Sequence, residues 1–438
     1  MNLMRRSWLL LLLWLASLVL ALALPGGGDE GNVFLSLAYV FTLLLALAFL
    51  WARFSLTDIS LSRQLRSSRS QVGKYAEEQL TLENEGRLPK LWLEVRDESE
   101  LPQHRVSRVV NALYAGQQHG WLVRTPCFRR GSYRLGPVTL LSGDPFGIFL
   151  WRRQLDLRDT LVVYPATYPL LGFRPAIGQL PGGETHRRRT HHTTTNVAGV
   201  RDYVPGDSFG RIHWPSTART GRLIVKEFEL DPLSDIWIFL DMDRRWHAGH
   251  LRAELPEVDL PSVLQLRGEP DEMYALDPCT EEYGVSIAAS LARHFLERDW
   301  SLGLVTYASH QRRDVAQADR GERQLERILS LLAVTHAEGS VPLAQVLISD
   351  THHLHRSTTA IVITPCLDQR WVAALAHLTM RGVRPIAIVI DSATFGAVAS
   401  DPQAAQGVAG DLAAVRVPTY LVRSGDRVSA ALSRPFGG

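Results

Sequence analysis

The sequence has few cysteines and no excess of charge of one sign. Its three cysteines, Cys127, Cys279 and Cys366, lie far apart and form no C-x-x-C pair. This spacing is unlike that of a disulfide framework or a zinc site, and it suits a reducing compartment. The 47 basic residues nearly balance the 45 acidic ones, for a net charge of +2. The balance excludes an acidic disordered chain and gives no reason to expect a nucleic-acid partner.

The sequence also lacks the common catalytic signatures. It contains no G-x-x-x-x-G-K-[ST] loop, no H-E-x-x-H and no G-x-S-x-G, which excludes nucleotide hydrolysis by the Walker route and removes the usual zinc-protease and nucleophile-elbow patterns. The histidines at 352, 353 and 355 have no supporting carboxylates beside them and fit an exposed loop. We therefore expect no catalytic residues. With 438 residues, 46% of them hydrophobic, the chain is long enough for two soluble domains.

Two uncharged apolar segments open the chain. Trp8–Leu24 and Val33–Trp51 have roughly 17 and 19 residues, each close to what a helix needs to cross a bilayer. The polar connection Pro25–Asn32 fits a helical hairpin. Basic residues flank the pair on its outer sides: Arg5, Arg6, Arg53, Arg63 and Arg66. By the positive-inside rule, residues 1–55 form a transmembrane hairpin, with spans at about 8–24 and 33–51, whose two ends face the cytoplasm.

A secretory signal is the alternative for the first segment. Arg5, Arg6, the leucine run and Ala21–Ala23 also fit a signal with a cleavage site. The second segment would then act as a stop-transfer sequence, and everything after it would still lie in the cytoplasm.

Residues 56–165 read as β-rich. Short stretches of alternating or apolar residues are separated by turn residues, at 79–83, 91–95, 121–124, 131–136 and 138–141, and Asp144–Gly147 closes the region as a turn. This spacing predicts a small, sandwich-like antiparallel β domain with a structural or interaction role.

Residues 166–233 lose the strand pattern and read as a linker that carries a motif. The basic run at 186–195, with Arg187–Arg189, fits either a solvated loop or a cationic loop that grips an acidic partner. The stretch that follows is rich in charged and aromatic residues. Its arginines offer planar guanidinium groups, and its acidic residues offer carboxylates that could pair with them. The candidate binding residues are Arg201, Asp202, Tyr203, Gly206, Asp207, Arg211, His213, Trp214, Ala218, Arg219, Lys226 and Glu227. We interpret this stretch as a loop that ion pairs and the Trp214 anchor lock against the two domains; the alternative is that the arginines face a ligand or partner.

At these residues the chain resembles the bacterial domain-of-unknown-function family number 58. The family pattern of R-x-Y-x-x-G-D, R-x-I-x-W, A-R and a V-K-E-F-E-like end is matched at Arg201, Tyr203, Gly206, Asp207, Arg211, Ile212, Trp214, Ala218, Arg219, Lys226 and Glu227. Pro215 stands where a basic residue is common. The resemblance implies a multi-pass protein of the bacterial inner membrane with cytoplasmic domains. Such proteins are often encoded beside a MoxR-type AAA+ ATPase and transglutaminase-like membrane proteins, and no enzymatic activity is established for them.

Residues 234–438 alternate apolar strands with helices. Strands are expected at 236–240, 302–307, 359–364, 385–390 and 419–422, and helices at 284–297, 324–333 and 371–380. Uninterrupted apolar strands joined by helices predict a Rossmann-like α/β domain, with a parallel sheet covered on both faces. Ligands of such sheets bind at the carboxyl ends of the strands.

The order of these elements resembles a von Willebrand factor A-like domain, which implies a magnesium site made by three loops. Asp241 fits the first loop, but Asp243 replaces a serine and Arg245 puts a cation where a hydroxyl belongs. Val341 and Pro365 stand at the ligand positions of the other two loops. A guanidinium can neutralise the carboxylates without a metal. We therefore expect a degenerate site that holds no magnesium tightly, and a protein without cofactors.

These features together predict a membrane-anchored, non-enzymatic adaptor or scaffold that presents a protein-binding surface to the cytoplasm. The resemblance suggests a MoxR-type AAA+ ATPase as its partner and transglutaminase-like membrane proteins as further ones. The acidic insertion at 244–283 fits either a docking arm or lid, or a disordered loop. A cryptic hydrolase that uses Asp202, Asp207 and His213 is the alternative function. Nucleic-acid binding by Arg187–Arg189 is a third, weaker hypothesis.

Overall fold

A computed structural model of the chain describes residues 2–3, 7–23, 29–173, 197–204, 207, 209–228, 235–253, 255, 276–309, 312–351, 354–356, 358–396 and 403–436. They form two compact units, one built on Met1–Ala166 and the other on Thr167–Arg252, Leu276–Leu331 and Thr335–Gly438. Each unit has its own apolar core. The basic run at 186–195 and most of the acidic insertion lie outside the described residues.

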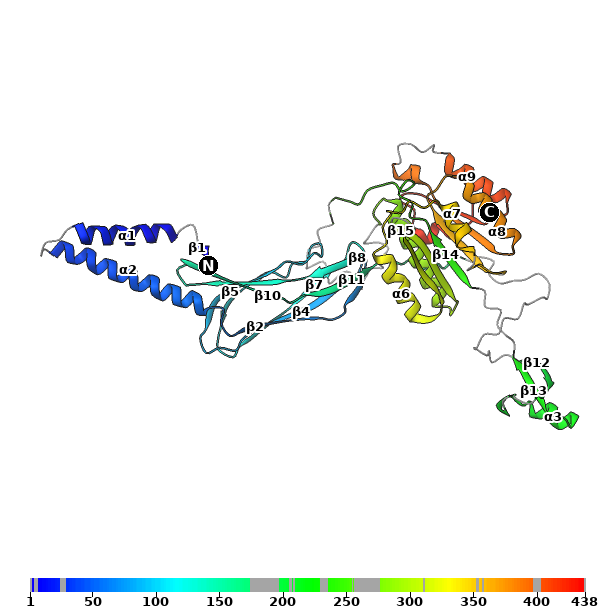
Figure 1. The fold of residues 1–438 in the computed structure, drawn as a ribbon, viewed down its shortest axis with the longest axis horizontal. Helices are drawn as coiled ribbons and strands as arrows, with labels where there is room; N and C mark the ends of the chain where they lie inside the picture. The colour runs from blue at the N-terminus through cyan, green and yellow to red at the C-terminus, as the bar shows by residue number, and fades with distance from the viewer. Residues whose placement is uncertain are drawn as a thin grey trace. The chain divides into compact units, whose positions relative to one another are not determined.

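The first unit begins with two apolar helices, α1 (Ser7–Ala23) and α2 (Asp29–Phe54), which lie side by side in Figure 1. The indole Nε1 of Trp14 on α1 donates a hydrogen bond of 2.9 Å to Thr42 Oγ1 on α2. Among the described residues, only Asn32–Phe54 is long and apolar enough to cross a membrane, with 23 residues and a mean hydropathy of 2.6. One span is therefore supported, and the second stays a prediction. The polar connection is shorter than expected, because α2 begins at Asp29.

The rest of the first unit is β-rich, as predicted. Its strands are β1 (Asn2–Leu3), β2 (Ile59–Leu65), β3 (Arg69–Gln71), β4 (Tyr75–Asn84), β5 (Lys90–Asp97), β6 (Arg108–Leu113), β7 (Gln118–Pro126), β8 (Gly131–Leu135), β9 (Val138–Gly143), β10 (Phe149–Leu155) and β11 (Asp159–Tyr164). They form sheets in the orders β1-β10-β9-β5-β6, β2-β4-β7 and β3-β11-β8. All neighbours are antiparallel except β3 and β11.

Two of these sheets share one apolar core. Leu61 on β2 and Leu80 and Leu82 on β4 belong to the same buried cluster as Leu93 on β5 and Leu140 on β9. In β2, β4 and β5 these residues alternate with more exposed ones, which is the pattern of a sheet with one face on the core. The two sheets therefore pack face to face, in the manner of a sandwich.

A cluster of ionisable side chains is buried within this β-rich region. Arg63 on β2, Glu78 on β4, Asp97 on β5 and His104 each have at most 2% of the side chain exposed. Arg63 Nε lies 3.1 Å from Glu78 Oε2, and Arg63 Nη2 bonds to Asp97 Oδ1. His104 Nε2 lies 3.1 Å from Glu78 Oε1. The Arg63 guanidinium is thus paired with two carboxylates in the interior, as a buried charge must be.

The second unit contains a six-stranded sheet in the order β16-β15-β14-β17-β18-β19. The strands are β14 (Ile236–Leu240), β15 (Leu302–Ser309), β16 (Arg312–Asp319), β17 (Thr359–Thr364), β18 (Arg384–Ile390) and β19 (Thr419–Val422), and the helices are α5 (Thr280–Leu296), α6 (Gly321–Ala333), α7 (Leu343–Ser349), α8 (Arg370–Met380), α9 (Ala404–Ala414) and α10 (Val428–Ala431). The five predicted strands are confirmed and run parallel. The sheet is nevertheless mixed, because β16, which was not predicted, lies antiparallel on its edge.

Successive residues of the central strand β14 point to opposite faces of this sheet. Trp237 and Phe239 join an apolar cluster with residues of α7, α8 and α9. Leu240 instead faces α5, where a Cβ on Gly284 would stand 3.5 Å from it. Helices therefore cover both faces, and the carboxyl ends of β14 and β17 lie side by side at one edge.

The motif segment, expected as a loop, is folded. Val197–Asp202 (β12) pairs antiparallel with Ile224–Phe228 (β13), and η1 (Phe209–Arg211) and α3 (Trp214–Thr220) lie between them in the chain. Pro215 explains the start of α3, because proline is favoured in the first helical turn, where its missing N–H costs nothing. Gly221 ends the helix in the left-handed conformation, with φ of 66°.

Candidate functional site

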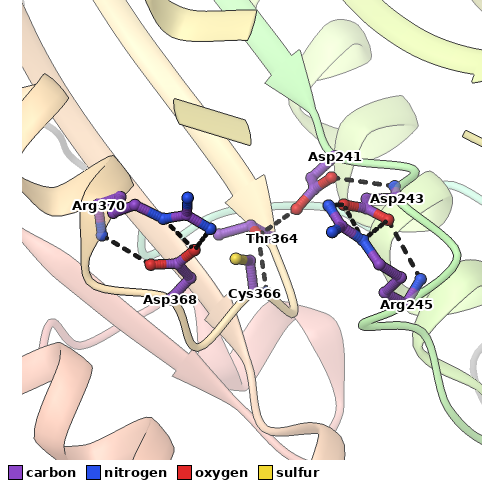
Figure 2. Close-up of polar contacts among 7 residues, drawn as sticks. All are labelled: Asp241, Asp243, Arg245, Thr364, Cys366, Asp368 and Arg370. Atoms are coloured by element: carbon purple, nitrogen blue, oxygen red, sulfur yellow. Dashed lines mark hydrogen bonds and ion pairs between the residues drawn. The ribbon is translucent and has the colours of Figure 1, made fainter. Parts of the chain in front are cut away.

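The first candidate site is the edge of the six-stranded sheet where β14 and β17 end (Figure 2). Leu240 pairs with Ile363, so the next residues, Asp241 and Thr364, come together. Thr364 Oγ1 donates to Asp241 Oδ2 at 2.6 Å, and the backbone N–H of Asp243 donates to Asp241 Oδ1 at 3.0 Å. Both oxygens of the buried Asp241 carboxylate are thus already bonded.

Arg245 neutralises the second carboxylate of this loop. Its Nε lies 2.9 and 3.1 Å from the two oxygens of Asp243, and its Nη2 bonds to Asp243 Oδ2 (Figure 2). The Asp243 side chain is fully buried, whereas 54% of the Arg245 side chain is exposed. A guanidinium bound on two sides by one carboxylate is a strong, charge-assisted pair. The Arg245 guanidinium thus pairs with the buried Asp243 carboxylate.

The other two loops offer this edge little that binds a cation. Gly339 lies beside Asp243 in a parallel bridge, and its N–H donates to Met242 O at 3.0 Å. Val341 packs partly against the apolar cluster. On the third loop the residue that contacts Asp241 is Thr364, one position before the expected Pro365. Among the described residues, no three His, Cys, Asp or Glu side chains are grouped to hold a metal ion. An octahedral magnesium ion needs several oxygen ligands, and the carboxylates of Asp241 and Asp243 are already bonded here; the expected lack of magnesium stays a prediction.

Burial changes the acidity of two groups at this edge. Burial raises the pKa of Asp241 to about 6, although the hydrogen bonds from Thr364 and the Asp243 backbone act against it. Burial also raises the pKa of the Cys366 thiol to about 12. The thiol therefore stays protonated at neutral pH and is a poor nucleophile.

A second arginine lies at the same edge. Arg370 Nε donates to Asp368 Oδ2 at 2.7 Å, and this pairing lowers the pKa of the Asp368 carboxyl. Arg245 and Arg370 both line a cavity of about 30 Å³ together with Trp246 and Trp371. Pockets for small organic ligands are typically about 300–1,000 Å³. The cavity therefore has room for little more than water.

The second candidate site is the motif segment (β12, η1, α3 and β13), held together by one bidentate ion pair. The Nη1 and Nη2 atoms of Arg201 each lie 2.7 Å from an oxygen of Asp207. The Asp207 carboxylate also accepts the backbone N–H of Val204 at 3.0 Å. Arg201 and Asp207 stand six residues apart, so the pair closes the turn between β12 and η1.

Two aromatic residues of the motif segment, Phe209 and Trp214, are largely exposed. Tyr203 stacks on Phe209 with ring centroids 6.0 Å apart, yet 72% of Phe209 is exposed. Trp214, expected to anchor a loop, is 63% exposed. Trp214 begins α3, and this helix has no buried residue, so the anchoring of Trp214 against the two domains stays a prediction.

The remaining motif residues are placed as follows. Ala218 and Arg219 lie on the exposed surface of α3, Arg211 ends η1, and Glu227 and Lys226 pair with Gly199 and Val200 across the two strands. Gly206 lies outside the described residues.

The three residues of the hydrolase alternative are each engaged separately. Asp202 on β12 lies opposite Ile224 on β13, and the backbone N–H of His213 donates a hydrogen bond to the carbonyl of Ile224. The Asp202 carboxylate lies 4.0 Å from Arg222, and His213 Nδ1 lies 2.7 Å from Ser216 Oγ. Asp207 is held by Arg201. Within the described motif segment these three side chains thus have different partners, and a shared role as general acid and base stays a prediction.

Sequence reasoning missed the groups that the fold brings together. Thr364 and Arg370 follow no motif, and only the strand register and the start of α8 place them beside Asp241 and Asp368. The buried cluster of Arg63, Glu78, Asp97 and His104 did carry a signal, because Arg63 and Glu78 stand at the same inward phase as Leu61 and Leu80.

Comparison with known proteins finds a family match that includes the motif segment. The model of the family described as "Protein of unknown function DUF58" matches residues 199–266. Uncharacterized protein YeaD of Bacillus subtilis (strain 168) is 25% identical over 225 residues, which is 51% of this chain and 47% of that protein. The chain thus matches about half the length of this relative.

The likenesses to solved structures are weak. The CARDB domain of a Pyrococcus furiosus protein, solved with di-metal ions, has a TM-score of 0.18 at 14% identity, over 24% of this chain and 92% of that one. Proximal thread matrix protein 1 from the mussel byssus has a TM-score of 0.28 at 14% identity, over 45% of this chain and 46% of that one. Scores this low carry no argument about fold or function. The family model and the Bacillus relative, in contrast, support the resemblance of this chain to the DUF58 family.

Proposed function

We propose that the protein is a membrane-anchored adaptor without enzymatic activity, whose motif segment binds a partner protein in the cytoplasm. The observation that carries the proposal is the contrast within the motif segment. Its charged turn is closed by the Arg201–Asp207 pair, while Phe209 and Trp214 remain 72% and 63% exposed. Exposed aromatic residues beside arginines are the side chains that most often dominate binding between proteins.

The apolar helices support the membrane anchor. α2 contains a segment long enough to span a bilayer. β1, just before α1, pairs with β10, and Phe49 near the end of α2 contacts Phe149 of the same strand. The start of α1 and the end of α2 thus lie at one end of the β-rich region, as a membrane hairpin with both ends on one side requires. The basic residues around these ends favour the cytoplasmic side.

The edge of the α/β sheet supports a role that is not catalytic. Arg245 occupies the Asp243 carboxylate, Cys366 is protonated, and the cavity beside them is too small for most organic substrates. By the family resemblance, the partner is a MoxR-type AAA+ ATPase, and transglutaminase-like membrane proteins are further candidates.

Affinity capture from membranes in mild detergent tests the proposal. The wild-type chain should retain the MoxR-type ATPase encoded beside it. Trp214→Ala should reduce the capture of this ATPase roughly 30-fold, which corresponds to a loss of about 2 kcal/mol of binding free energy at a hot spot. Ile348→Ala is the matched control, because Ile348 on α7 is also exposed, at 65%. Equal capture by the wild type and a folded Trp214→Ala variant would remove the motif segment from the interaction.

A hydrolase that uses Asp202, Asp207 and His213 remains the alternative function. A broad substrate screen on the full chain, with Asp207→Asn as the paired control, separates the two functions. Turnover by the wild type that disappears in Asp207→Asn would favour the hydrolase.

A further inference from the structure

The hairpin of β9 and β10 packs against the apolar helix α2. Phe49 of α2 makes edge-to-face contacts with Phe149 and Trp151 of β10, at centroid distances of 5.7 and 6.3 Å. The Arg53 guanidinium carbon lies 5.6 Å from the centre of the Trp151 ring. Phe49 stands five residues before the end of the apolar segment Asn32–Phe54, a rise of about 7.5 Å along a helix. The hairpin therefore reaches alongside the apolar part of α2.

The tip of this hairpin satisfies its own backbone N–H groups. The Asp144 carboxylate accepts the N–H groups of Phe146, Ile148 and Phe149, at 2.9, 2.9 and 2.6 Å. The N–H of Gly147 donates to the Asp144 carbonyl at 3.1 Å, and Pro145 has no N–H. Every backbone donor from 145 to 149 is thus bonded within the tip. Entry into an apolar phase requires this, because lipid chains offer no hydrogen bonds.

Two apolar side chains at the tip face outward. Phe146 is 63% exposed, and Pro145 beside it is exposed as well. Ile148 is buried, so it fixes the turn from within. The turn therefore presents an exposed apolar surface next to a helix that could span a membrane. Exposed apolar surfaces of this kind often mark a site of contact, and here the lipid bilayer is the adjacent apolar phase.

Residues along β10 change from apolar to basic with distance from the tip. Phe149, Leu150 and Trp151 come first, and Arg152 and Arg153 follow. The Arg152 side chain is 58% exposed. Aromatic residues followed by arginines are typical of the boundary between acyl chains and headgroups.

We propose that the tip Asp144–Phe149 is a second membrane contact, with Phe146 inserted at the boundary between the headgroups and acyl chains on the side where α2 ends. This proposal rests on the proposed membrane anchor. The contact fixes the β-rich region against the bilayer surface, so the region is held at two points instead of turning freely about the end of α2.

Depth-dependent quenching tests the contact. The environment-sensitive fluorophore NBD is placed at Phe146→Cys in the full chain, with Cys127, Cys279 and Cys366 replaced by alanine, and the protein is reconstituted in vesicles of phosphatidylethanolamine and phosphatidylglycerol. Ser68→Cys is the control, because Ser68 is exposed and lies beyond the far end of β2, a strand about 20 Å long. Insertion into the membrane should shift the emission of the label at 146 to the blue, and lipids brominated near the carbonyl end of the acyl chains should quench it. The label at 68 should show neither change.

Extraction of the same vesicles with alkaline carbonate separates the two proposals. A chain that resists extraction but shows no quenching at position 146 overturns the hairpin contact and leaves the anchor intact. A chain that carbonate removes overturns both. Equal quenching at 146 and 68 also overturns the contact, because it would show a region lying flat on the bilayer and not one that touches it through the hairpin tip.

Discussion

Replacing Arg63 by leucine should weaken the β-rich region far more than replacing an arginine at its surface. Arg63 is 1% exposed and lies between Glu78 and Asp97, each 2% exposed. Removal of its charge leaves two carboxylates in the interior with His104 as their remaining basic neighbour. Breaking a buried ion pair from one side costs about 3–5 kcal/mol, because the charge left behind is neither hydrated nor paired.

Hydrogen exchange measures this loss locally, which suits a chain of two units that does not unfold in one step. A loss of 3–5 kcal/mol corresponds to a fall in the protection of the β4 amides of about 100- to 5,000-fold. Arg66→Leu is the control, since Arg66 is 79% exposed and pairs with Glu77 at 2.6 Å. A surface pair contributes at most about 1 kcal/mol, so the control should lose less than about tenfold.

Leucine at all three positions of the buried group, Arg63, Glu78 and Asp97, should recover most of the lost protection, because apolar residues can replace a buried ion cluster at little cost. The reasoning fails if Arg63→Leu loses no more protection than Arg66→Leu. It also fails if the triple variant is less protected than the single one.

Three further predictions concern the edge of the α/β sheet. Burial raises the pKa of Asp241 from 3.8 to about 6, so the folded state holds its proton more tightly. The resulting stability is full below about pH 4 and is lost as the pH rises through about 6, a change of about 3 kcal/mol. The unfolding free energy of this unit should therefore fall over that range by about 3 kcal/mol more in the wild type than in Asp241→Asn, and equal slopes would contradict the prediction. Titration of the full chain with manganese, followed by electron paramagnetic resonance, should show no tight site; near-octahedral binding that Asp241→Asn abolishes would restore the magnesium site. Gly339→Ala should destabilise this unit by about 3 kcal/mol in the same unfolding measurement, because its Cβ would stand 2.7 Å from Met242 O; an unchanged unfolding curve would show that the loop adapts.

Long apolar patterns made the α/β sheet predictable. The strands at 236–240 and 359–364 are apolar throughout because helices cover both of their faces, and their bounds in the structure agree with the prediction. β16 was missed since it is an edge strand whose sequence, RRDVAQAD, has few apolar residues. α9 was missed because its alanines and glycines give it no marked apolar stripe.

For the motif segment, the residue types predicted the ion pairing, but the strands and the helix were not predicted. Its charges suggested ion pairs, and Arg201 and Asp207 do form one. Its two strands escaped notice because charged residues interrupt their apolar positions, and its helix α3 is only seven residues long. The exposure of Trp214 could not be predicted, since a tryptophan anchors a core or a partner with the same sequence signature.

The wide separation of the site residues along the sequence limited the prediction of the site itself. Asp241 and Thr364 are 123 residues apart, and the register of β14 on β17 alone makes them neighbours. Sequence spacing located the loop to within one residue, at Pro365, but could not show which side chain faces the carboxylate.

Photo-crosslinking in living cells tests the adaptor most directly, because it reports both the side of the membrane and the partner. A photoreactive phenylalanine analogue in place of Trp214 should form a crosslink to the cytoplasmic MoxR-type ATPase, and the same analogue in place of Ile348 should not. Crosslinks from position 214 to periplasmic proteins, or to the ATPase from both positions alike, would contradict the account.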